Sequence, residues 1–193
     1  MENFVKPSES LPEQVDVLIV GAGNAAMCAA LEERESGVGV ALLERAPLDE
    51  YGGNIRFTAG AIRCVYDGIE DLRKLMPDLS EQEIANSDFG TYTEDQFFDD
   101  IGRVTQYRCD PDLAETLIRN SRETMHWMRS QGLRFQPIWG RQAFKVDGKL
   151  KFWGGISYHN YPGGSGLMAS SVFGRIAGGS ATEAITDQQS QAQ

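Results

Sequence analysis

The chain has 193 residues, 41% of them hydrophobic and 24% charged, which is typical of a globular protein with one domain. Its net charge of −10 excludes nucleic acid and anionic membrane surfaces as expected partners, because both are polyanions. The three cysteines lie far apart without a C-x-x-C pair, so we expect no disulfide framework and no metal site.

The first 14 residues are polar and carry two prolines, and we expect them to form a flexible lead. They lack the basic and apolar regions of a secretory signal. The chain also lacks the run of about 18 apolar residues that a membrane-spanning helix needs. These patterns predict a cytoplasmic protein without a membrane span.

Residues 15–30 (VDVLIVGAGNAAMCAA) combine a strand, a tight turn and a helix. Residues 15–20 are mostly apolar and β-branched, which predicts a buried strand. The G-x-G-x-x-A pattern that follows is typical of a dinucleotide site. Gly21 permits a sharp turn, Gly23 lets the backbone approach a pyrophosphate, and Ala26 lets the helix pack closely on the strand. The N-terminus of the helix then offers N–H groups and a partial positive charge to phosphate.

A second strand is predicted at residues 38–44 (VGVALLE), which completes a β-α-β unit. Glu44 stands at its end, at the spacing where an acidic side chain accepts hydrogen bonds from a ribose. Taken alone, Glu44 is equally well explained as a solvated strand end. Its spacing from the glycines favours the ribose role.

Three further segments rich in glycine are candidates for cofactor contacts: GGN at 52–54, TAG at 58–60 and GGSGL at 163–167. Taken singly, the first two are more often plain turns, but both follow the nucleotide-binding start of this chain. The third feeds a helix, and this arrangement favours binding of an anion or a polar edge over a plain loop. The last one opens a helix over residues 167–177, which Gly178 and Gly179 are expected to end. Residues 181–193 are expected to form a flexible tail.

The middle of the chain is predicted to form several helices, followed by a small hairpin. Thr93 with Gln96 forms a capping box, and Asp110 followed by proline starts a longer helix. His126, on that longer helix, is interpreted as a surface or packing residue. Other helices are expected at 67–75 and 80–85, and strands at 134–138, 143–146 and 149–153, the last two joined by the Asp-Gly turn at 147–148.

The runs VDVLIVGAGNAAMCAALEERESGVGVALLERAP and GGNIRFTAGAIR resemble the FAD-dependent fumarate reductase/succinate dehydrogenase flavoprotein family, closest to its tricarballylate dehydrogenase-like branch. The run YHNYPGGSGLMASSVFGRIAG resembles the last helix of that family. The resemblance implies an α/β fold, a Rossmann-type FAD-binding domain over residues 15–180. It also implies that two family segments join near 153–158, so that the middle region with the capping domain is absent.

The resemblance implies FAD as cofactor and hydride transfer between the flavin and a di- or tricarboxylate. No catalytic residue can be matched. The implied cofactor-binding residues are Gly21, Gly23, Asn24, Ala25, Ala26, Glu44, Arg45, Gly53, Asn54, Thr58, Ala59, Gly60, Ser165, Gly166 and Leu167.

Two alternatives stay open at this stage: a non-catalytic FAD-binding fragment or isoform, and an NAD-binding Rossmann protein. With only two convincing parallel strands, apolar sheet edges stay uncovered. We therefore expect a homo-oligomer, a partner chain over the incomplete sheet, or low solubility.

Overall fold

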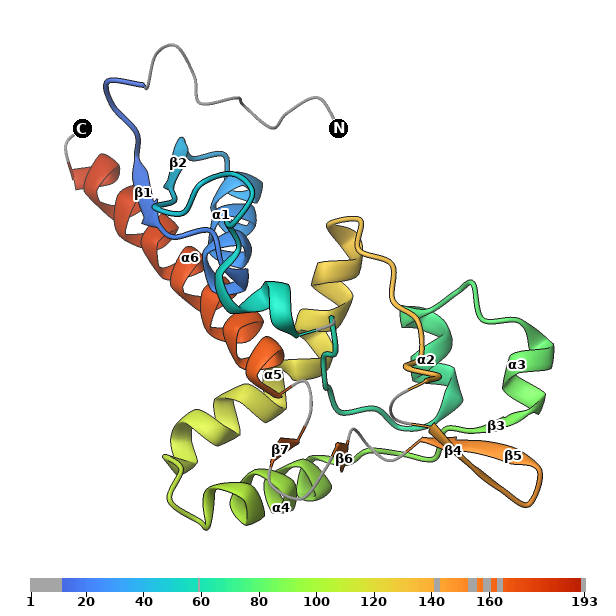
Figure 1. Ribbon diagram of the computed structural model, residues 1–193. Helices are drawn as coiled ribbons and strands as arrows, with labels where there is room; N and C mark the ends of the chain where they lie inside the picture. Colours follow the sequence, from blue (N-terminus) through green and yellow to red (C-terminus); the bar gives the residue numbers. More distant parts are fainter. Residues whose placement is uncertain are drawn as a thin grey trace.

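The structure is a computed structural model, and it describes residues 12–58, 60–140, 143–152, 156–157, 161–162 and 165–191. It has a β-α-β part at one end and a small sheet at the other, with helices between them (Figure 1). Among the described residues, no helix is both long and apolar enough to cross a membrane.

The β-α-β part consists of one β-α-β unit and the last helix of the chain. β1 (Val17–Val20) pairs in parallel with β2 (Val40–Leu43), and α1 (Asn24–Glu35) connects them. The register joins Val17 to Val40 and Val20 to Leu43, so both strands end at the same edge. The predicted β-α-β start is therefore confirmed.

β1 is less buried than its sequence predicts. Val17 and Ile19 are half-buried, whereas Leu18 is 55% and Val20 81% exposed. Side chains alternate across a strand, and only one face of this two-stranded sheet is covered by helices of the described chain. The expectation of a strand buried on both faces is therefore wrong.

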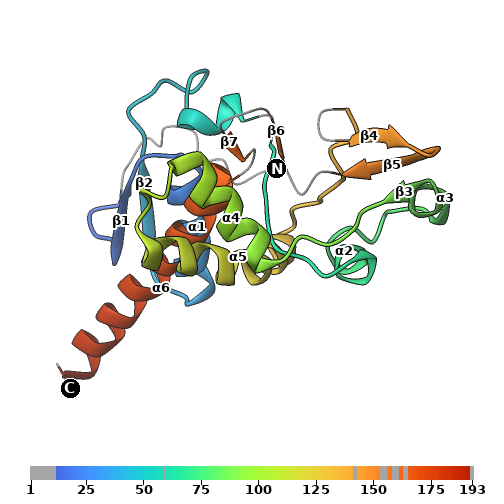
Figure 2. The ribbon, with the colours of Figure 1, turned by 90° about the horizontal axis from the view of Figure 1, so that it is seen from below.

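α6 (Ser165–Gln191) lies along α1, and the two helices run parallel. Gly174 lies against the backbone of Ala25, and Gly178 lies against that of Ala29, so the contacts advance together along both helices. The expected helix end at Gly178 is therefore wrong. Gly178 is buried in the helix contact, where the missing side chain lets the two backbones approach. Figure 2 shows the C-terminal part of α6 projecting from the rest of the molecule.

α5 (Pro111–Ser130) is the central helix and packs against α4, α6 and α2. Its N-cap Asp110 accepts hydrogen bonds from two backbone N–H groups, as the sequence predicts. α4 (Glu94–Thr105) begins at the predicted capping box of Thr93 and Gln96. The helices α2 (Ile69–Leu75) and α3 (Glu81–Ala85) also form, and a short 3₁₀ helix, η1, covers Gly53–Phe57. The largest apolar side chains that are completely buried come from α4, α5 and α6: Phe97, Ile118, Met168 and Val172.

The second sheet has three strands, in the order β3 (Ser87–Asp88), β5 (Lys149–Phe152) and β4 (Ala143–Val146). The predicted hairpin is confirmed, since Asp147 and Gly148 both have positive φ, as its tight turn requires. β3 was not predicted. Two further strands, β6 (Ile156–Ser157) and β7 (Tyr161–Pro162), pair with each other.

Residues 134–138, predicted as a strand, do not pair with any described strand. Pro137 cannot donate to a ladder, and its carbonyl accepts a hydrogen bond from the Trp139 N–H at 3.0 Å instead. This irregular segment lines a cavity.

Candidate functional site

Four residues meet where β1 and β2 end, and we call this place the cradle: Gly21, Gly23, Glu44 and Gly52. Gly21 has φ of +107° and makes the sharp turn out of β1. Its N–H donates to the carbonyl of Leu43 at 2.6 Å, which joins the turn to the end of β2.

Gly23 is the N-cap of α1, and no side chain caps this helix. The first N–H groups of a helix have no partner within it, so the first turn of α1 keeps donors for an external ligand. A Cβ at Gly23 would lie 3.9 Å from the carbonyl oxygen of Gly52. The structure thus brings residues 21–23 (GAG) next to residues 52–54 (GGN). Because Gly23 has no side chain, the space at the turn stays open.

Glu44 is held at both of its carboxylate oxygens. It accepts hydrogen bonds from the N–H groups of Ala22 and Ala46, each at 2.8 Å. The bond from Ala46 and then that from Ala22 lower the pKa of Glu44 below its usual value. A charged carboxylate is therefore fixed beside the glycine turn, and each oxygen keeps a lone pair for a hydroxyl group. Arg45 lies exposed next to it.

Asn24 connects the cradle to α6. Its side-chain amide donates to the carbonyl of Leu167 at 3.1 Å and to the hydroxyls of Ser170 and Ser171 at 2.8 and 2.7 Å. The amide is thus occupied by protein contacts, which fix the start of α6 beside the start of α1. Gly166 is exposed at that start, and the side chain of Ser165 lies outside the described residues.

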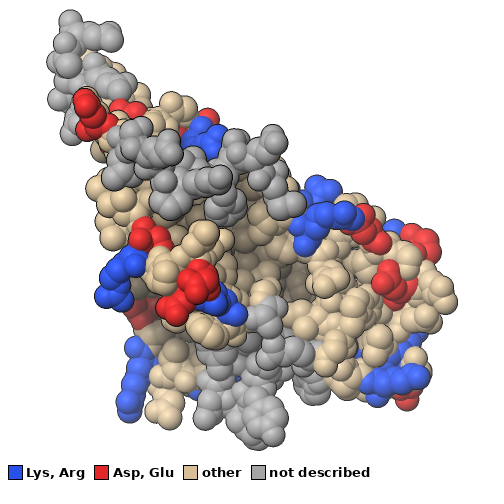
Figure 3. Space-filling model, turned by 45° about the horizontal axis from the view of Figure 1, so that its top comes forward, with Lys and Arg blue, Asp and Glu red and all other residues tan. Residues whose placement is uncertain are grey.

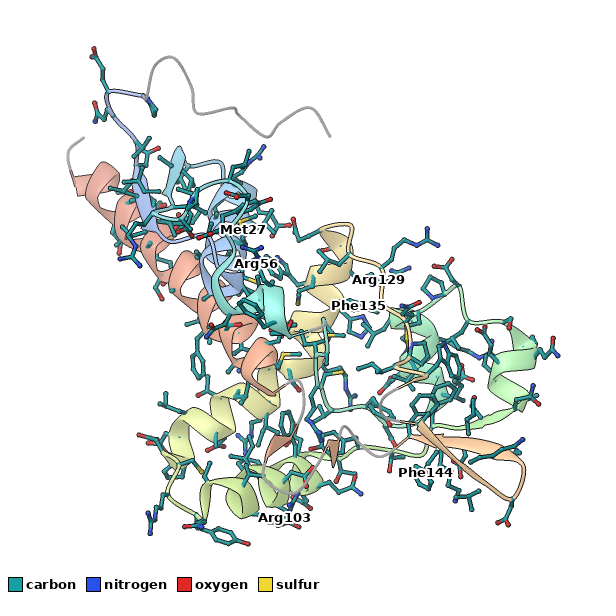
Figure 4. The ribbon with its side chains drawn as sticks, viewed as in Figure 1. Met27, Arg56, Arg103, Arg129, Phe135 and Phe144 are labelled. Atoms are coloured by element: carbon teal, nitrogen blue, oxygen red, sulfur yellow. The ribbon has the colours of Figure 1, made fainter. Side chains whose placement is uncertain are left out.

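The remaining predicted residues divide between the cradle and a neighbouring region. Ala25 and Ala26 lie in the first turn of α1. Gly53 and Asn54 are exposed at the start of η1. Figure 4 shows Met27 on α1 and Arg56 on η1, the two helices that border the cradle.

The TAG segment leads away from the cradle. Thr58 Oγ1 donates to the carbonyl of Ile55 at 2.9 Å and accepts from the N–H of Gly60 at 3.1 Å, which closes a turn. Ala59 lies outside the described residues. Gly60 lies at the wall of a cavity of about 600 Å³, whose other walls come from the end of α2, from residues 134–140 and from Phe152.

Sequence reasoning missed this cavity. Its wall includes the side chains of Arg63, Tyr66 and Tyr92. Burial raises the pKa of Tyr92 and raises that of Tyr66 to about 12, so both hydroxyls stay protonated. The aromatic residues of the cavity wall are spread over four segments, so no local motif marks the cavity.

The chain has two histidines, and the structure describes one of them. His126 is half-buried on α5, in keeping with the packing role expected of it. His159, which the sequence places just before the last glycine cluster, lies outside the described residues.

The sequence of this chain was compared with models of known protein families, and one of them matches nearly the whole chain. The model of the FAD binding domain matches residues 16–189. Fumarate reductase (cytochrome) of Shewanella frigidimarina is 28% identical over 120 residues, which is 62% of this chain and 18% of the relative. Urocanate reductase of Eggerthella lenta is 32% identical over 136 residues, 67% of this chain and 19% of the relative. This chain thus spans less than a fifth of the length of these curated relatives.

Among solved structures, the open conformation of a flavocytochrome c3 fumarate reductase is similar with a TM-score of 0.47 and 20% sequence identity. The similarity covers 88% of this chain and 26% of that one.

Proposed function

Because the chain belongs to the FAD-binding domain family, we propose that its cradle holds FAD and that it is the flavin-binding part of an oxidoreductase acting on carboxylates. The observation that carries the proposal is the convergence of Gly23, Glu44 and Gly52 at the edge where β1 and β2 end. Uncapped N–H groups suit a pyrophosphate, and a fixed carboxylate suits a ribose.

Several of the predicted residues then have a physical role. The first turn of α1 donates backbone N–H groups to the pyrophosphate, and Gly23 leaves room for it. Glu44 accepts hydrogen bonds from the adenosine ribose. Asn24 positions the start of α6 through its hydrogen bond to Leu167. Gly53, Asn54, Thr58 and Gly60 would line the pyrophosphate and flavin side of the cofactor.

When bound, FAD supplies hydride transfer: the reduced flavin gives a hydride to one carbon of a double bond, and the other carbon takes a proton. Fumarate and urocanate, named in the two relatives, are both unsaturated carboxylates. We therefore propose reduction of an unsaturated carboxylate as the reaction in which this chain participates.

Flavin binding is tested by visible absorption of the purified chain after incubation with FAD and removal of the excess. We expect a yellow protein from the wild type and from Gly179→Val, because a Cβ at Gly179 meets nothing within 4 Å. We expect a colourless protein from Gly23→Val, since the added carbons fill the space that a pyrophosphate needs. A colourless wild type, or a yellow Gly23→Val variant, contradicts the proposed cradle.

The reaction is tested separately, by oxidation of a reduced viologen dye with fumarate or an unsaturated tricarboxylate as acceptor. Turnover that depends on bound flavin supports the oxidoreductase. A yellow but inert chain leaves flavin binding standing and refutes catalysis by this chain alone.

A further inference from the structure

The cradle itself has little positive charge to offer a pyrophosphate. The uncapped start of α1 supplies backbone N–H groups and a partial charge. Glu44, whose carboxylate is held by the N–H groups of Ala22 and Ala46, adds a negative charge nearby. Since the pyrophosphate of a dinucleotide is itself doubly negative, its binding favours a cationic side chain beside Gly23.

Many of the described arginine and lysine side chains already pair with a carboxylate. Arg73, for example, lies 2.7 Å from Glu81. In Figure 3, basic side chains lie beside acidic ones over much of the visible face, around a hollow of mostly uncharged surface. Arg45 directly follows Glu44, and the charges of the two side chains interact. These cations are therefore compensated within the chain.

Arg56, on η1, lies against a residue of the cradle. A Cβ built at Gly52 would lie 3.5 Å from Cγ and 4.0 Å from Cδ of Arg56, so the stem of this side chain covers Gly52, which is buried. The carbonyl oxygen of Gly52 in turn lies 3.9 Å from the position of a Cβ at Gly23. Figure 4 labels Arg56 on η1, close to Met27 of α1. Gly52 thus connects the stem of Arg56 to the start of α1.

The guanidinium group of Arg56 is available to a ligand. The side chain is exposed, and within the described part of the chain it takes part in no hydrogen bond or ion pair. Its N–H donors form a planar fork that matches two oxygens of a phosphate at once. Because the stem is anchored on Gly52, this fork is within reach of a phosphate bound at Gly23.

We propose that Arg56 is the cation that pairs with the pyrophosphate of FAD in the cradle. Its guanidinium group would donate to phosphate oxygens together with the backbone N–H groups of α1, and its charge would offset that of the pyrophosphate. This inference deepens the proposed function and rests on it. It adds a side chain to a site that the glycine pattern describes only through its backbone.

The test measures binding of three probes to the full chain by titration calorimetry: FAD, ADP and adenosine. ADP keeps the pyrophosphate without the flavin, and adenosine keeps the ribose without any phosphate. Arg56→Gln removes the charge but retains the Cγ and Cδ atoms that cover Gly52. We expect this variant to bind FAD and ADP about tenfold more weakly than the wild type, and adenosine equally well, because only the phosphates lose a partner.

The matched control is Arg34→Gln, which changes the net charge by the same amount. Arg34 is exposed and lies ten positions after Asn24 on α1, about 15 Å along the helix axis from the cradle. We expect this control to bind all three probes like the wild type. Arg56→Lys keeps the charge without the fork, so its affinity for FAD should lie between those of the wild type and Arg56→Gln.

Four outcomes distinguish this inference from the proposed function. Unchanged FAD and ADP binding by Arg56→Gln overturns the inference alone, as does an equal loss in Arg34→Gln, which would be an effect of net charge. Loss of adenosine binding by the same factor also overturns it, because the cradle itself would then be altered. A wild type that binds neither FAD nor ADP contradicts the cradle and the inference together. ADP binding that depends on Arg56, in a chain that takes no FAD, supports the inference and refutes the proposed FAD site.

Discussion

Glu44 is a single carboxylate whose charge is maintained by backbone geometry. Both of its oxygens accept backbone N–H groups, and its pKa is lowered as a result. At pH values above the pKa that Glu44 has in the unfolded chain, its charge adds to the free energy of unfolding. This contribution is lost as the pH falls through the lowered pKa that Glu44 has in the folded chain. Acid therefore removes the stabilising contribution of Glu44 to the folded state.

We expect Glu44→Gln to weaken FAD binding about tenfold at neutral pH, because a charged acceptor of the ribose hydroxyls becomes neutral. It should also unfold at lower urea concentration than the wild type at neutral pH, and this difference should shrink as the pH falls through the lowered pKa. Fluorescence titration of FAD and urea unfolding at several pH values measure the two effects. Glu50→Gln, in the exposed turn after β2, is the control and should change neither. A difference from the wild type that grows with acid would contradict the role of the charge.

At the scale of elements, the contact between α1 and α6 depends on two glycines. A Cβ at Gly178 would lie 2.7 Å from the carbonyl oxygen of Ala29. One at Gly174 would lie 2.9 Å from the carbonyl carbon of Ala25 and would meet its oxygen as well. These neighbours are backbone atoms of a helix, so they cannot move aside without shifting α1.

We expect Gly174→Ala to lower the free energy of unfolding by about 1–3 kcal/mol, the cost of overpacking a close contact. Gly179→Ala is the matched control in the same helix. It should leave stability unchanged or raise it by up to about 1 kcal/mol, because alanine is the better helix former and nothing obstructs its Cβ. Urea unfolding, followed by circular dichroism, measures the stability of both variants. Equal urea midpoints for the two variants would contradict the close contact.

These elements also show which features sequence reasoning can reach. The helix starts at Thr93 and Asp110 were predicted because capping depends on residues three or fewer positions away. The continuation of α6 past Gly178 could not be predicted in this way, because it depends on a contact with Ala29, which is far away in the sequence. The cavity was missed for the same reason, since Gly60, Phe89 and Trp139 come from separate segments.

At the scale of the whole molecule, the sheet of β1 and β2 leaves an apolar face open. Leu18 is 55%, Val20 81% and Leu43 43% exposed. Apolar residues gathered on an uncovered sheet favour association with another protein surface. This is the basis of the expectation that a second copy or a partner covers the sheet.

We expect the isolated chain to associate as its concentration rises, as measured by sedimentation velocity. Leu18→Lys should shift this association to at least about tenfold higher concentration, because it places a charge on the open face. Leu113→Lys is the matched control, since Leu113 is also 55% exposed but lies on α5. A wild type that stays monomeric at every concentration would contradict the expectation.

The uncapped start of α1 has a consequence for the kinetics of cofactor uptake. It contributes a partial charge of roughly +0.5 at the cradle. The chain as a whole carries −10 and repels the doubly charged pyrophosphate at long range. Salt screens that long-range repulsion, whereas the attraction of the helix end acts over a few ångströms and is screened far less. FAD should therefore associate faster at physiological ionic strength than in dilute buffer, the reverse of the behaviour of proteins that capture phosphates with exposed lysines.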